Sequence, residues 1–132
     1  FDHLITNPPY FINSLKSPDI GRNTARHTDE LPLKSLVELS SLLLTDSGKL
    51  SVVFPFAESQ ILISLAAESS LSIKRQLIII PKQGKEPNRI LLEFTKKPVK
   101  NMETAKLTIR DLNGKYTQEY IDLTESFYLK LS

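Results

Sequence analysis

Four consecutive residues near the start of the chain, Asn7-Pro8-Pro9-Tyr10, have the side chains and spacing needed to act on a planar amino group. The amide oxygen of Asn7 and the backbone carbonyl of Pro8 can accept two hydrogen bonds from one NH₂ group, and the proline rings fix the direction of the second acceptor. Two such acceptors free the nitrogen lone pair and stabilise the positive charge that grows on nitrogen as a methyl group arrives. The set therefore predicts methylation of an exocyclic amino group such as that of adenine, with no metal ion required.

Aromatic residues beside these acceptors could hold the target base. Tyr10 offers a flat face for stacking, and Phe11 a second wall. The alternative is a plain turn that ends a strand, but such a turn needs neither Asn nor Tyr beside two prolines. Phe54 and Phe56 are interpreted as core residues, with a base pocket as the alternative.

A strand over Phe1–Thr6 must position the acceptors, because the two prolines end it directly before Tyr10. In open α/β sheets the site lies beyond the carboxyl ends of the strands. The remaining patterns are listed by range: strands over 49–54, 72–80 and 89–96; helices from about Pro32 to Asp46-Ser47-Gly48, over 57–70 and over 119–131; a loop over 10–29; and a hairpin with one arm at 107–109, a turn at Asn113-Gly114 and a return at Tyr116.

This order predicts an α/β fold with a mostly parallel sheet, in which the short link between the strands at 72–80 and 89–96 makes those two antiparallel. Glycine at position 48 is expected to take a left-handed helix cap. We expect residues 1–132 to form one partial domain, with a sheet-and-helix core over 1–98 and a hairpin-helix tail over 99–132. The opening in a strand without an initiator methionine suggests a piece of a longer protein.

Composition narrows the function classes. The chain has 132 residues, 40% of them hydrophobic, and no cysteine, which excludes disulfides and thiolate metal sites and fits the cytoplasm. No apolar run has membrane-spanning length. The net charge is +2, but basic residues gather in one stretch, which is either a solvated surface or a phosphate-contacting face. They are Lys74, Arg75, Lys82, Lys85, Arg89, Lys96, Lys97 and Lys100.

The stretch Phe1–Phe11 resembles strand four and the catalytic loop of class I amino-methyltransferases. Further segments resemble bacterial tRNA (adenine-N6)-methyltransferases, which modify the adenine beside the anticodon of a valine tRNA. Those segments are Ser14–Asp19, Arg22–His27, Pro81-Lys82 with Arg89, and Phe127–Lys130.

The resemblance implies S-adenosyl-L-methionine as cofactor, tRNA as partner and the strand order 3-2-1-4-5-7-6, of which this chain would supply strands four to seven. It implies that Arg22, Arg26 and His27 border the RNA site, with an ordinary exposed loop as the alternative. Lys82, Lys85 and Arg89 are candidate contacts to the RNA backbone, with a solvated surface as the alternative, and Asn7 would also touch the cofactor. The family's glycine-rich cofactor loop is absent, because no Gly-x-Gly pattern occurs.

Other functions remain open on the residues alone. The same acceptors could present a glutamine amide, as in methyltransferases acting on release factors, because that nitrogen is also planar and delocalised. A non-catalytic RNA-binding piece is the third possibility, since the cofactor loop is missing. The first strand is expected to have an open edge that pairs with another copy, is covered or is disordered.

Overall fold

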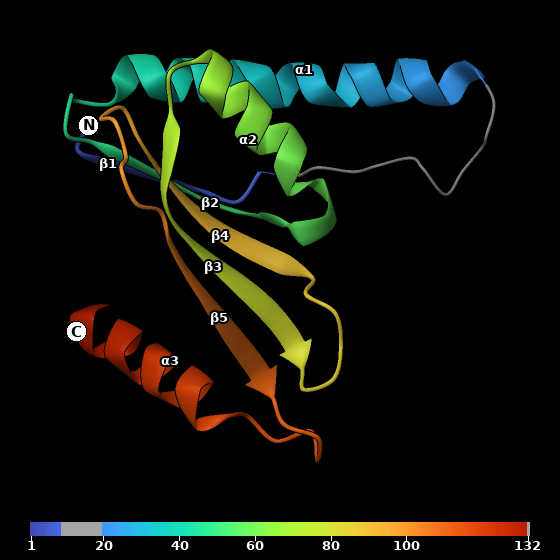
Figure 1. Ribbon diagram of the computed structural model, residues 1–132, viewed down its shortest axis with the longest axis vertical. Helices are drawn as coiled ribbons and strands as arrows, with labels where there is room; N and C mark the ends of the chain where they lie inside the picture. Colours follow the sequence, from blue (N-terminus) through green and yellow to red (C-terminus); the bar gives the residue numbers. More distant parts are fainter. Residues whose placement is uncertain (9–19, 132) are drawn as a thin grey trace.

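The computed structural model describes residues 1–8 and 20–131, with side chains described for 1–8 and 32–125. These described residues form three α-helices, five strands and one short 3₁₀ turn, and the last three strands follow one another without a helix between them. Their bounds are β1 His3–Thr6, α1 Ile20–Leu43, β2 Lys49–Pro55, η2 Phe56–Glu58, α2 Ser59–Glu68, β3 Ser72–Lys82, β4 Arg89–Thr95, β5 Glu103–Arg110 and α3 Gln118–Leu131. The ribbon places α1 and α2 together on one face of the sheet and α3 beside β5 (Figure 1).

The five strands form one sheet in the order β1-β2-β4-β3-β5. β1 pairs with β2 and β3 with β5 in parallel, whereas β4 is antiparallel to both of its neighbours. Four strands therefore run in one direction and β4 runs against them. The neighbours β1-β2-β4-β3 reproduce the expected order 4-5-7-6, and β1 lies at one edge, as expected.

The core lies between the sheet and the pair α1 and α2. In β2 the alternation of apolar and polar residues buries Leu50, Val52 and Phe54 on the helix side and leaves Ser51 toward the other side. Each such fully buried side chain contributes about 1.5–3 kcal/mol relative to exposure. The buried cluster comprises Leu33, Val37, Leu44, Leu50, Val52, Phe54, Leu62, Ala66, Leu71, Ile90, Leu92 and Phe94. Phe54 is thus a core residue, and Phe56 packs against this cluster.

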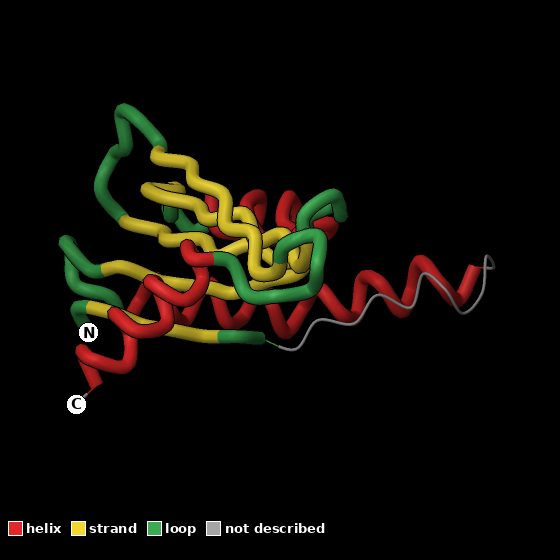
Figure 2. Tube along the Cα trace, turned by 90° about the horizontal axis from the view of Figure 1, so that it is seen from below, coloured by secondary structure: helices red, strands yellow, loops and turns green. Residues whose placement is uncertain are grey.

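The prediction that a helix begins near Pro32 was wrong, because α1 begins at Ile20 and contains Pro32. Proline removes one helical hydrogen bond, but Pro32 is exposed, so the carbonyl that loses its partner can bond water. The predicted loop over 10–29 is therefore helix from residue 20, and residues 10–19 lie outside the described residues. The N-terminal half of α1 projects past the sheet, on the side where β1 ends (Figures 1 and 2).

Two local expectations differ from the structure. The hairpin is reduced to a single antiparallel bridge between Arg110 and Tyr116, because its first arm extends into β5 and joins the main sheet beside β3. Gly48 does not have a positive φ; among the described glycines that conformation occurs at Gly84 and Gly114. Gly48 is required for another reason, since a Cβ there would lie 2.9 Å from the Phe1 carbonyl oxygen.

Candidate active site at the carboxyl edge of the sheet

Asn7 and Pro8 follow the last residue of β1 directly, at the carboxyl end of that strand. Thr6 is paired with Val52 of β2, so the sheet fixes the point from which the two acceptors start. Asn7 is exposed and Pro8 is half-buried. Neither residue is deep in the interior. A site that acts on a macromolecule must be accessible from solvent, so these positions meet that requirement. Pro9, Tyr10 and Phe11 lie outside the described residues.

The structure brings two of the expected basic contacts to the same edge. Lys82 ends β3 and Arg89 begins β4, and because β4 runs antiparallel, its start lies beside the ends of its neighbours. Arg89 is paired with Pro55 on one side and with Ile79 on the other. β4 is two strands from β1, which corresponds to roughly 10 Å of sheet. Arg89 is exposed and Lys82 is half-buried, so both meet solvent.

Arg22, Arg26 and His27 lie on α1 rather than in a loop, which corrects the expected setting. Their side chains lie outside the described ones. Their backbone belongs to the part of α1 that projects past the carboxyl end of β1 (Figure 2).

The basic stretch from Lys74 to Lys100 is split by the fold. Lys82, Lys85 and Arg89 lie at the carboxyl edge, around the β3–β4 turn. The remaining lysines lie at the opposite edge, where Lys74, Lys97 and Lys100 line a hollow of about 430 Å³. Lys96 donates from Nζ to the Leu44 carbonyl oxygen at 2.7 Å. The stretch is therefore no single phosphate-contacting face.

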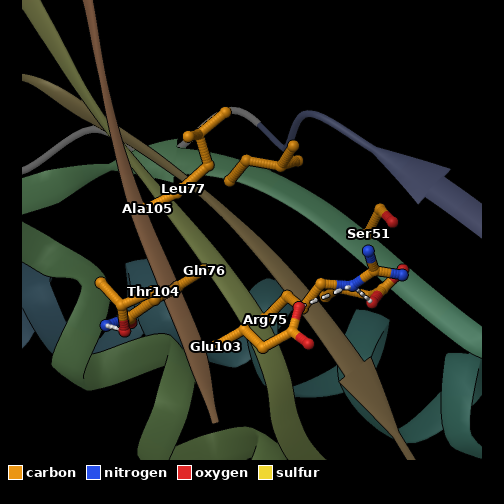
Figure 3. A pocket seen from close by; sticks show the side chains of 9 residues that line it. Ser51, Arg75, Gln76, Leu77, Glu103, Thr104 and Ala105 are labelled. Carbon is orange, nitrogen blue, oxygen red and sulfur yellow. Dashed lines mark hydrogen bonds and ion pairs between the residues drawn. The ribbon is translucent and has the colours of Figure 1, made fainter.

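A second hollow, of about 420 Å³, lies in the middle of the sheet face opposite α1 and α2. Arg75 lines it and donates from Nε to a Glu93 carboxylate oxygen at 2.9 Å, while Glu103 lies 3.9 Å from the same Nε (Figure 3). The hydrogen bond and the charge of Glu93 raise the pKa of Arg75 above its ordinary value. The residues that line this hollow include none of those that the sequence predicted for the active site, so we assign the hollow no catalytic role.

The sequence did not indicate the contact that joins Arg110, the last residue of β5, to Tyr116 and to Tyr120 of α3. The Arg110 guanidinium carbon lies 4.2 Å from the ring centre of Tyr116, and that ring stacks on Tyr120 at 5.0 Å. The turn at Asn113-Gly114 was the available signal, because it folds residue 116 back onto residue 110.

Within the described part of the chain, no helix has the length and apolar character needed to cross a membrane. The described side chains also hold no group of three or more His, Asp or Glu residues placed to bind a metal ion.

Known proteins resemble this chain in fold and in sequence. No protein-family model matches the chain. A predicted O-methyltransferase from Agrobacterium tumefaciens shares the fold, with a TM-score of 0.67 at 19% identity over 95% of this chain and 51% of that one. The chain thus has the α/β fold of about half of that methyltransferase structure, which agrees with the expected fold class.

The relatives found by sequence indicate the family more specifically than the similar structure does. The tRNA1(Val) (adenine(37)-N6)-methyltransferase of Parabacteroides distasonis is 40% identical over 131 residues, which cover 99% of this chain and 55% of the relative. The protein of the same name from Tolumonas auensis is 39% identical over 132 residues, 100% of this chain and 55% of the relative. The chain matches the C-terminal part of this tRNA (adenine-N6)-methyltransferase family, which confirms the resemblance, and it spans about half the length of these relatives.

Proposed function

We propose that the protein to which this chain belongs methylates the exocyclic N6 amino group of an adenine in tRNA, with S-adenosyl-L-methionine as cofactor. The observation that carries the proposal is the Asn-Pro pair placed directly beyond β1, with Asn7 exposed at the carboxyl edge. The names of the relatives support tRNA and adenine N6 as substrate and position. A chain without cysteine fits the cytoplasm as the place of this tRNA processing.

The cofactor would supply a methyl group on a sulfonium sulfur. The part of this chain in the reaction is to orient the acceptor nitrogen. The Asn7 amide oxygen and the Pro8 carbonyl oxygen each accept a hydrogen bond from one N–H of the amino group. Tyr10 and Phe11 stack on the base. With both hydrogen bonds formed, the nitrogen lone pair would be free to attack the methyl carbon that the cofactor would supply, and the amino group would release its surplus proton to water. No step needs a metal ion.

The chain fits the substrate side of such a site better than the cofactor side. Among the described glycines, Gly84 and Gly114 lie in separate turns and Gly48 is packed against the Phe1 carbonyl. None of them forms a phosphate- or ribose-cradling loop. Asn7 is the one residue that we assign to both sides, and the other cofactor contacts would come from outside this chain.

Replacing Asn7 by Ala in the complete protein tests the proposal. We expect kcat for tRNA methylation to fall by about 100-fold or more, because one of two preorganised acceptors is lost. The matched control is Asn101→Ala, which removes another exposed amide from the hollow at the opposite edge. Equal turnover of Asn7→Ala and the control would contradict the role of Asn7.

Substrate choice is tested with the wild-type protein. Methyl incorporation is measured into bulk tRNA and into a release factor, whose glutamine amide the same acceptors could hold. Incorporation into tRNA alone supports the proposal. Incorporation into the release factor alone overturns it, and tRNA binding without any incorporation favours a non-catalytic RNA-binding role.

We also propose that the free edge of β1 is a pairing edge for a second copy when the 132-residue chain is produced alone. β1 pairs with β2 only among the described residues, and Ile5 is 75% exposed on it. Sedimentation of the chain should show a dimer, and Ile5→Lys should shift it to monomer. A wild-type monomer would refute this pairing.

A further inference from the structure

The stack at the end of β5 has the chemistry of a nucleic-acid contact. Arg110 lies over the Tyr116 ring at 4.2 Å, donates from Nη1 to the Gly114 carbonyl at 2.8 Å and from Nη2 to the Tyr116 hydroxyl at 3.1 Å. These bonds use two of the five N–H donors of a guanidinium. Arg110 is exposed and Tyr116 is 49% exposed. Tyr120 also stacks on the Tyr116 ring, at 5.0 Å, so the surface that can meet a base is the exposed guanidinium plane of Arg110, held over Tyr116 with three donors to spare.

Other residues already hold this segment in place. The Asp111 carboxylate accepts hydrogen bonds from the backbone N–H groups of Asn113 at 2.8 Å and Lys115 at 3.0 Å, which fixes the turn. The Thr117 hydroxyl caps α3 by accepting from the Tyr120 N–H at 3.2 Å. The turn and the helix start thus have their own stabilising contacts, and an exposed stack of Arg110 and Tyr116 is not needed for them.

The stack lies on the same edge as the candidate active site. Arg110 is in register with Lys82, and the Gln83 N–H donates to the Arg110 carbonyl at 2.8 Å. Lys85 is exposed in the same β3–β4 turn. Lys82, Lys85 and Arg110 thus lie at the same edge of the sheet, and cations beside a planar stack suit a phosphate backbone with an unstacked base.

We propose that Arg110 and Tyr116 form a stacking platform for an unpaired base of the tRNA, with Lys82 and Lys85 contacting the adjoining phosphates. This proposal rests on the proposed function for the identity of the RNA. β5 is four strand spacings from β1, about 19 Å before the twist of the sheet is counted. The platform therefore binds a nucleotide other than the one held at Asn7, and it acts on RNA affinity rather than on the chemical step.

The test compares variants of the complete protein with an unmodified valine tRNA transcript. Tyr116→Ala should raise the Kd for the transcript about tenfold, within the range for loss of one base stack, and leave kcat at saturating RNA unchanged. Tyr116→Phe keeps the ring but loses the bond to Arg110, and it should bind like wild type. Arg110→Gln should weaken binding and lower the salt dependence of log Kd by about one charge.

Lys106→Gln is the matched control, because it removes a charge from an exposed position in the middle of the same strand. It should bind the transcript more tightly than Arg110→Gln does. The platform is overturned if Tyr116→Ala binds like wild type, or if Tyr116→Phe loses as much affinity as Tyr116→Ala. The thermal midpoint of each variant shows whether it folds. If Tyr116→Ala does not fold, the Kd of Arg110→Gln for the transcript is compared with that of Lys106→Gln, and equal values overturn the platform.

Failure of the proposed function gives a different result. A wild-type protein that methylates tRNA, with Tyr116→Ala and Arg110→Gln unimpaired in binding, rejects the platform alone. A wild-type protein that binds the transcript in a Tyr116-dependent way without methylating it rejects the enzyme and retains the platform.

Discussion

Lys96 reaches from the segment after β4 to the end of α1, where its ammonium group donates to the Leu44 carbonyl oxygen at 2.7 Å. Carbonyls at a helix end have no helical partner, and a cation there also opposes the negative end of the helix dipole. Lys96 therefore joins the sheet to α1 at the edge opposite the candidate active site.

Lys96→Met should lower the free energy of unfolding by about 1 kcal/mol, because the stem is kept and the charged hydrogen bond is lost. Urea denaturation of both variants measures this against Lys97→Met, whose parent side chain is exposed next to it. Equal losses for the two variants would show that the bond to Leu44 contributes nothing.

Replacement of Leu92 by Ala should destabilise the fold strongly. Leu92 is fully buried in β4, at the centre of the core, and its truncation leaves a cavity that costs about 2–5 kcal/mol. Leu42→Ala is the control, since that side chain is 82% exposed on α1. A similar change in the denaturation midpoint for both would contradict the position of the core.

Pro32→Ala tests the extent of α1. Inside the helix, replacement should raise the free energy of unfolding by about 1–3 kcal/mol and increase the helical circular dichroism signal. If the helix began at residue 32, proline would be favourable there and its removal would be neutral or destabilising. Pro98→Ala, outside any helix, controls for the general loss of a proline.

Gly48 and Gly114 are required for different reasons. Replacing each of them by asparagine distinguishes the two reasons. Asparagine tolerates a positive φ, so Gly114→Asn should stay within about 1 kcal/mol of wild type. Gly48→Asn should cost about 1–3 kcal/mol, because its Cβ would press on the carbonyl oxygens of Phe1 and Thr45. Thermal denaturation distinguishes the two, and equal midpoints would contradict the close approach at Gly48.

Only part of the sheet order was predictable from the pattern of strands and links, whereas the full order was implied by the family resemblance. The six-residue link between Lys82 and Arg89 has no room for a crossover, so β3 and β4 had to be antiparallel neighbours. The place of β5 was not predictable in this way. Its pairing with β3 is non-local, and local pattern alone suggested a hairpin instead.

Of the candidate site, the sequence predicted the position of Asn7 and the edge that carries Lys82 and Arg89. It did not predict the start of α1, because proline is favourable in the first turn of a helix and Pro32 therefore indicated that the helix begins there. It also missed Arg110 and Tyr116, which become neighbours only when the turn between them closes.

The reversal of β4 has a consequence for how this sheet can change over evolution. It puts the β3–β4 turn at the edge of the candidate active site, while both strands stay fixed in the interior of the sheet. Lengthening such a turn costs only about 0.6 kcal/mol per doubling. Residues can therefore be inserted between Gln83 and Asn88 without moving Asn7, so this turn can change in length and composition while the candidate active site stays in place.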